Sequence, residues 1–151
     1  GMPVTCLRFF TVYGPCVRPD MAYFSFTQNI LEGRPVNVFN GGNLSRDFTY
    51  IDDIVEGVLR VADQIPHGAP PCRLYNIGNN NPVQLIDFIS TIENATGKKA
   101  VLNMLPMQPG DVTATHADID ALSAATGFRP STDLAEGIGK FVEWYREYYG
   151  V

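Results

Sequence analysis

The chain has 151 residues, of which 45% are hydrophobic and 18% charged, so it can bury the core of about one domain. Its net charge of −5 argues against a nucleic-acid partner, which would require a basic face. No apolar run reaches the roughly 18 residues that a membrane span needs, so no membrane partner is expected.

The first predicted elements are a strand and a helix. Residues 4–12 (VTCLRFFTV) form an apolar, β-rich run that ends at Tyr13-Gly14-Pro15, which is typical of a strand buried on both faces in a parallel sheet. A helix is predicted over residues 20–33, because Asp20 can cap its start and Gly33 can end it.

A second strand and helix follow. The pattern predicts a short strand at 36–39, a strand at 46–51 and a helix over 52–62. Asp52 and Asp53 stand at the start of this helix, where carboxylates favour the positive end of the helix dipole. We therefore interpret the two carboxylates as helix-capping groups rather than as a catalytic pair.

The rest of the chain continues the alternation. Pro82 suits the first position of a helix, and Gly97 ends that helix. Asp133 and Glu136 have capping-box spacing and begin the last helix. The predicted elements here are strands at 74–77 and 100–105 and helices at 82–97, 120–126 and 133–149. Strands and helices alternate throughout, which predicts an α/β fold.

Cysteine and histidine usage indicates neither disulfides nor a metal site. The cysteines are odd in number and show no C-x-x-C spacing, which is typical of a reduced, cytoplasmic protein: Cys6, Cys16 and Cys72. His67 and His116 lie far apart in the sequence without a ligand cluster beside them. No secretory signal opens the chain. Gly1 before Met2 is expected to be a remnant of a cleaved expression tag, with Met2 as the native start.

Several catalytic and cofactor motifs are absent. No strand is followed by G-x-x-G-x-x-G or G-x-G-x-x-G, the turn that holds a dinucleotide pyrophosphate, and the glycines of 40–43 precede a strand instead. No Tyr-x-x-x-Lys is present, since Val17 and Ile54 follow Tyr13 and Tyr50 at that spacing. The G-x-S-x-G elbow is also missing. The sequence therefore shows no catalytic base, nucleophile or cofactor loop.

Seven segments carry recognisable patterns: LRFFTVYGP (7–15), RPDMA (18–22), SRDFTYIDDIVEG (45–57), YNIGN (75–79), NMLPMQPGDV (103–112), DLAEGI (133–138) and FVEWYREYY (141–149). In this order they resemble the C-terminal half of UDP-glucuronate 4-epimerases, of the extended short-chain dehydrogenase/reductase superfamily. The resemblance implies that 1–151 is a single substrate-binding domain, the C-terminal part of that fold without its glycine-rich dinucleotide-binding portion. Gln108 supports the glucuronate epimerase subfamily.

The resemblance also implies a nucleotide site. The Arg of the R-D-F pattern, Arg46, is expected to contact the nucleotide diphosphate, which a guanidinium suits as a bidentate cation. Phe39 matches the position that stacks on uracil, and Asp111 a position that contacts the ribose. The alternatives are an Arg46 paired with Asp47, a buried strand Phe39 and an Asp111 that only ends a turn.

Thr11 and Arg18 flank the Tyr13-Gly14-Pro15 turn, and in the resembling epimerases this region meets the sugar carboxylate. A uronate needs hydrogen-bond donors, which both side chains supply. The chain departs from the usual pattern here, because Cys16-Val17 replaces a common Trp-Gly and Ser25 replaces a common Lys or Arg.

In the full-length family NAD takes and returns a hydride at C4 of the sugar. Phe10 and Val12 are expected near the nicotinamide of a full-length enzyme, at the seam between its halves. This chain is expected to bind no NAD of its own, to bind a UDP-sugar weakly and to be catalytically inactive alone.

Two alternatives remain open. The chain could be a stand-alone nucleotide- or protein-binding module from a truncated gene, or the substrate domain of a related UDP-sugar decarboxylase or dehydratase. The partner is expected to be a missing N-terminal half or a second copy, because an uncovered apolar strand over 4–12 is an association surface.

Overall fold

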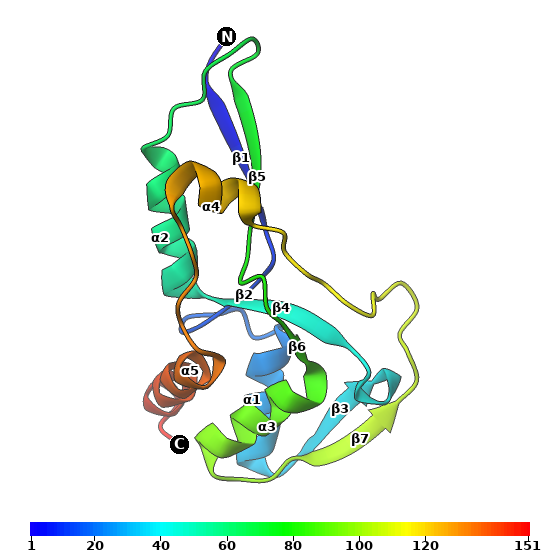
Figure 1. Ribbon diagram of the computed structural model, residues 1–151. Helices are drawn as coiled ribbons and strands as arrows, with labels where there is room; N and C mark the ends of the chain where they lie inside the picture. Colours follow the sequence, from blue (N-terminus) through cyan, green and yellow to red (C-terminus); the bar gives the residue numbers. More distant parts are fainter.

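Strands and short helices alternate along the chain in the computed structural model, which describes residues 1–151 (Figure 1). The strands are β1 (Val4–Phe9), β2 (Thr11–Tyr13), β3 (Pro35–Phe39), β4 (Ser45–Tyr50), β5 (Cys72–Ile77), β6 (Pro82–Gln84) and β7 (Val101–Leu105). The helices are α1 (Ala22–Glu32), α2 (Ile51–Ala62), α3 (Leu85–Thr96), α4 (Asp120–Thr126) and α5 (Leu134–Tyr149), with a 3₁₀ turn η1 (Asn40–Gly42). None of these helices combines the length and the apolar character needed to cross a lipid bilayer.

Strand β4 pairs with a different strand on each of its two sides. It pairs in parallel with β2, where Thr11 lies opposite Phe48, and antiparallel with β6, where Arg46 lies opposite Val83. Residues 47–50 of β4 are all buried, so both faces of the strand contribute to the interior. Arg46 is therefore the last partly exposed side chain before β4 enters the core.

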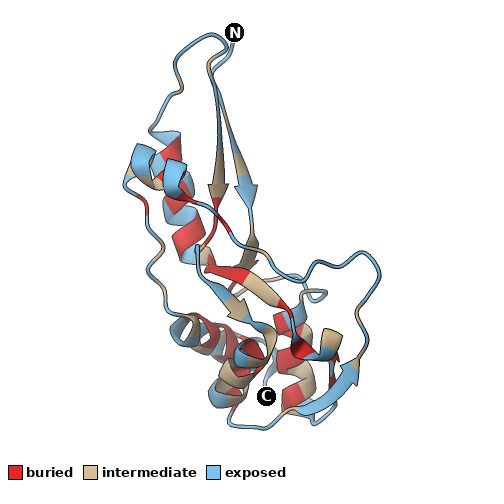
Figure 2. Ribbon diagram, turned by 45° about the vertical axis from the view of Figure 1, so that its right-hand side comes forward, coloured by how far each residue is buried: buried red, intermediate tan, exposed pale blue.

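The main core lies between β4 and the helices α1, α3 and α5. Helix α3 contributes Phe88, whose ring stacks on Phe48 of β4 with 3.9 Å between ring centroids. Phe141 of α5 meets Tyr23 of α1 edge to face at 5.0 Å. Figure 2 shows the buried residues on the faces that these helices turn toward one another. Burial of these large rings is the main source of stability in this part.

The other part is a parallel ribbon of β1 and β5, which α2 and α4 cover on one side (Figure 1). Leu7 and Tyr75 are in register and pack on a small core formed by Ile54, Val61, Ile77, Leu122 and Phe128. Cys6 and Leu74 are also in register but exposed, as expected from the period of two along a strand. One face of the ribbon is therefore open (Figure 2).

The predicted strand over 4–12 is two strands. The backbone N–H of Phe10 donates to the carbonyl of Ile77 at 3.2 Å, and the chain then leaves β5 and pairs with β4 as β2. The prediction of burial on both faces is wrong for β1, because Val4 is 38% and Phe9 54% exposed. Self-association through this strand stays a prediction.

Most predicted helix ends are confirmed. Gly33 and Gly97 end α1 and α3 in the left-handed conformation, with φ of 69° and 70°, which glycine adopts without strain. Asp133 caps α5 by accepting a hydrogen bond from the backbone N–H two residues on, at 2.8 Å. Asp20 does not cap α1, because the N-cap position is Met21; the Asp20 carboxylate lies 3.4 Å from the guanidinium of Arg18.

Pro82 does not begin a helix. It is the first residue of β6 and lies opposite Asp47, and α3 begins three residues later at Leu85. A proline is tolerated at the first position of a strand at the edge of a sheet, where no ladder donor is required. Residues 82–84, which local preference assigns to the helix, thus form the short antiparallel strand β6.

Asp53 has a different role from the predicted one. Asp52 and Asp53 do lie in the first turn of α2, but neither side chain caps that helix. The buried carboxylate of Asp53 accepts hydrogen bonds from the backbone N–H groups of Ser131 and Thr132, at 3.1 and 3.0 Å. Asp53 therefore ties α2 to the segment that leads into α5.

Candidate functional site

Two adjoining cavities lie where α1 meets β2, β3 and β4. The first cavity has a volume of about 510 Å³ and is bounded by α1, β3, β4 and the segment after β7. The second cavity, of about 750 Å³, lies along β2 and the turn that leads toward α1. Thr11, Met21 and Tyr23 line both cavities, so the two cavities share a wall. The volumes are in the range of small-molecule sites.

The first cavity brings together residues that are distant in the sequence. Thr11 comes from β2, Phe39 from the end of β3, Arg46 from the start of β4 and Asp111 from the segment after β7. Among the predicted substrate-binding residues, only Arg18 does not line it. Gln108 lines the same cavity. The arrangement offers an aromatic ring, one guanidinium and polar side chains around an apolar wall.

Phe39 is half-buried and lines the cavity, so it is not the fully buried strand residue of the alternative interpretation. Asn37 stands two residues earlier on the same side of β3 and also lines the cavity. Its side-chain oxygen accepts a hydrogen bond from the amide of Asn103 on β7 at 2.8 Å, which fixes its orientation. The sequence interpretation missed Asn37, although its spacing from Phe39 was a usable signal.

Arg46 pairs with Asp111 rather than with Asp47. Nη2 of Arg46 lies 2.6 Å from Oδ1 of Asp111, and Nη1 donates to the carbonyl of Ser45 at 2.9 Å. The side chains are 21% and 31% exposed, so water partly screens this pair. The same Oδ1 accepts the backbone N–H of Val112 at 2.8 Å. The guanidinium is thereby held at the wall of the cavity.

Asp47 is fully buried and holds two loops beside the site. Its Oδ1 accepts the backbone N–H of Asn79 at 2.8 Å, and its Oδ2 accepts those of Asn80 and Ala117 at 3.0 and 2.8 Å. Three such bonds compensate the burial of a charge. Asp47 therefore has a structural role next to Arg46.

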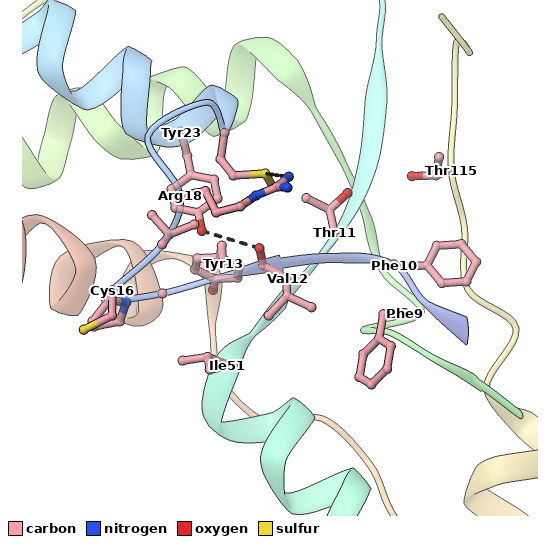
Figure 3. Close-up of a pocket in the computed structure, with 14 residues that line it drawn as sticks. Phe9, Phe10, Thr11, Val12, Tyr13, Cys16, Arg18, Tyr23, Ile51 and Thr115 are labelled. Carbon is pink, nitrogen blue, oxygen red and sulfur yellow. Dashed lines mark hydrogen bonds between the residues drawn. The ribbon is translucent and has the colours of Figure 1, made fainter. Parts of the chain in front are cut away.

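The second cavity contains the remaining predicted residues. Figure 3 shows Arg18 above β2, with Phe10, Thr11 and Val12 along the strand. The Arg18 side chain is 77% exposed and makes only a 3.7 Å contact with the sulfur of Met21 besides its pair with Asp20. The guanidinium is therefore available to an anionic group that enters from the first cavity. The structure places Phe10 and Val12 at its wall, where their predicted relation to a nicotinamide stays a prediction.

The tyrosines near the cavities lack the environment of a catalytic base. Burial, with a smaller contribution from Asp53, raises the pKa of Tyr13 well above its ordinary value. Burial also raises the pKa of Tyr50. Lys140 lies over the ring of Tyr50, 5.3 Å from its centroid, and is paired with Glu136 at 2.7 Å. Lys140 lowers the pKa of Tyr50, but burial and the charge of Asp52 outweigh it. A tyrosine base requires a lowered pKa, so the net effect is in the opposite direction.

The starts of α2 and α3 do not fit a dinucleotide pyrophosphate. Helices α2 and α3 begin directly after strands, without a glycine turn, and their first turns carry Asp52, Asp53 and Asp87. Carboxylates at these helix starts repel a pyrophosphate where a dinucleotide site needs free backbone N–H groups. No group of three or more His, Cys, Asp and Glu side chains is placed to hold a metal ion.

The fold and the cavities define the class of protein. The α/β fold matches solved epimerase structures of the extended short-chain dehydrogenase type. The chain belongs to the NAD dependent epimerase/dehydratase family, whose pattern matches residues 1–78.

Similarity to individual proteins extends over the whole chain. It is 52% identical to an uncharacterized 37.6 kDa protein of Escherichia coli O111:H-, over 100% of this chain and 49% of that protein. It is 47% identical to a probable UDP-glucuronate 4-epimerase of Rhizobium meliloti, over 98% of this chain and 48% of the relative. The crystal structure of a UDP-glucuronic acid 4-epimerase from Bacillus cereus, in complex with UDP-glucuronic acid and NAD, superposes with a TM-score of 0.88 at 34% identity. That match covers 97% of this chain and 46% of that one. The chain thus spans about half the length of the relatives it matches.

Proposed function

We propose that this chain is the UDP-sugar-binding portion of a nucleotide-sugar epimerase that interconverts UDP-glucuronate and UDP-galacturonate. The observation that carries the proposal is the first cavity, where Phe39, Arg46, Asp111 and Thr11 meet from four separate parts of the sequence. Similarity to probable and established UDP-glucuronate 4-epimerases supports the choice of sugar nucleotide.

The chemistry of each part suits a segment of the ligand. Phe39 offers a ring face for a base, and the amide of Asn37 lies beside it. Arg46 offers two parallel donors for a diphosphate. The sugar would then extend into the second cavity, where Thr11 and Arg18 donate to a carboxylate. Binding in this order fixes the position of the sugar ring, which is what a substrate domain contributes to a reaction.

We also propose that this chain alone neither binds NAD tightly nor epimerises UDP-glucuronate. The acidic helix starts and the raised pKa values of Tyr13 and Tyr50 support this part of the proposal. Cys6, Cys16 and Cys72 are free and exposed, which supports a reducing compartment such as the cytoplasm.

Isothermal titration with millimolar UDP tests the binding site. We expect weak binding by the wild type and a loss of about 10- to 100-fold in Arg46→Ala, the equivalent of a charge-assisted hydrogen bond. The matched control is Arg34→Ala, because Arg34 also pairs with a carboxylate at 2.6 Å, that of Glu32, but lines neither cavity. Equal responses of the two variants would contradict the role of Arg46.

Chromatography after incubation of UDP-glucuronate and NAD with the purified chain tests catalysis. We expect no UDP-galacturonate. Steady turnover that Tyr13→Phe or Tyr50→Phe abolishes would contradict the proposal and identify a catalytic base in this chain.

A further inference from the structure

Arg46 already has an anionic partner within the chain. The carboxylate of Asp111 lies 2.6 Å from its guanidinium, and both groups line the first cavity. Asp111 and the Ser45 carbonyl each use one N–H of the guanidinium, and the carboxylate also neutralises much of its single positive charge. A diphosphate that binds Arg46 therefore meets a like charge beside it. Ligand and carboxylate therefore compete for one cation.

Asp111 belongs to a segment with few other attachments. Residues 106–112 lie between β7 and the segment that pairs with Ser45. In that pairing the N–H of Ser45 donates to the carbonyl of Thr113 at 2.9 Å, and the N–H of Thr115 donates to the carbonyl of Ser45 at 3.2 Å. Within 106–112 the backbone makes only local bonds, such as that from Asp111 to Gln108. The bond from Arg46 is the one hydrogen bond that joins this segment to the rest of the fold.

We propose that Asp111 is a built-in counter-ion of Arg46, which an incoming diphosphate must displace, so that Asp111 determines how strong an anion the site admits. The inference rests on the proposed function and deepens it. Displacing the carboxylate lowers the affinity of every anion by the same factor, because the same bridge must break for each. Groups with one charge then bind too weakly, whereas a diphosphate with two or more charges binds. Displacement also releases segment 106–112 from its one outside bond.

Titration with inorganic pyrophosphate and with inorganic phosphate tests the exchange without a base or sugar. In Asp111→Asn we expect both anions to bind about three- to tenfold more tightly, by a similar factor, since a partly exposed pair is weaker than a buried one. Asp20→Asn is the matched control, because it removes the same charge from the wall of the same cavity. Asp20 pairs with Arg18 and not with Arg46, so its gain should be smaller.

Hydrogen exchange provides a second measurement that a general charge effect would not change. Amides of 106–112 should exchange faster in Asp111→Asn than in the wild type, and pyrophosphate should produce the same increase in the wild type. Unchanged or weaker pyrophosphate binding by Asp111→Asn, or an equal gain in Asp20→Asn, would overturn the inference. If the inference is overturned in this way but UDP still binds the wild type, the proposed function stands. If UDP binds neither the wild type nor Asp111→Asn, the proposed function fails, whereas the titrations with pyrophosphate and phosphate still decide the exchange.

Discussion

The backbone of Gly137 in α5 lies directly against the phenol ring of Tyr13 in β2, and a Cβ at Gly137 would lie 2.8 Å from two ring carbons. Gly137→Ala should therefore destabilise the fold. Overpacking costs about 1–3 kcal/mol, which exceeds the gain of about 1 kcal/mol in helix propensity. A urea titration should show a lower midpoint of unfolding. Gly139→Ala is the control, since nothing lies within 4 Å of its added Cβ, and it should unfold at an equal or higher urea concentration.

Asp53 and Asp52 are adjacent acidic residues with different surroundings, which makes them a matched pair. Asp53→Asn weakens two bonds to backbone N–H groups of a buried contact and should cost about 2–3 kcal/mol in the free energy of unfolding. Asp52 is exposed, so Asp52→Asn should change that free energy by about 0.5 kcal/mol or less. Equal changes in the two variants would contradict the prediction. They would mean that Asp53 contributes to stability through its position in the first turn of α2 and not through its hydrogen bonds to Ser131 and Thr132.

Asp47→Asn should cost about 3 kcal/mol, because a neutral amide cannot accept the three backbone N–H bonds that the buried carboxylate receives. It should also weaken UDP binding, since Asp47 directly follows Arg46 on β4. Chemical denaturation and titration with UDP measure the two effects. Asp118→Asn is the control, because its exposed carboxylate accepts a single backbone bond at 3.1 Å, and a comparable loss there would contradict the prediction.

The fold should lose stability at high pH. Burial raises the pKa of Tyr13 and of Tyr23 above the value of about 10 that tyrosines have in an unfolded chain. Both states are protonated below about pH 10, so the contribution is fully present there. Above that pH the unfolded chain loses the proton first, and the free energy of unfolding falls by up to about 1.4 kcal/mol per pH unit and group. Tyr13→Phe should reduce this slope in urea titrations between about pH 9 and pH 11. An unchanged slope would contradict the assignment.

Local rules predicted the elements whose causes are local. Gly33 and Gly97 end their helices because left-handed backbone favours glycine, and Asp133 caps α5 because its carboxylate reaches a neighbouring N–H. Pro82 shows the limit of these rules, since pairing with β4 over a distance in sequence overrides its helical preference. The break at Phe10 has the same origin, because the chain pairs with β5 before this residue, as β1, and with β4 after it, as β2.

The site was predictable as a set of residues but not as a set of contacts. Thr11, Phe39, Arg46 and Asp111 were identified through family patterns, and the structure brings all four to one cavity. Neither spacing nor composition reveals that Arg46 pairs with a carboxylate 65 positions away instead of with its neighbour Asp47. Such partner choice depends on which loops meet in three dimensions.

The pairing of Ser45 with Thr113 and Thr115 determines when, during folding, the molecule gains affinity for UDP. One wall of the first cavity exists only after two distant stretches of chain have met, and closing so large a loop is entropically costly and slow. Recovery of UDP affinity during refolding should therefore coincide with the last kinetic phase. A ligand that recognises only the finished molecule also stabilises it by mass action, by about 1.4 kcal/mol for each tenfold excess over Kd. Saturating nucleotide would thus act as a thermodynamic reporter of complete folding.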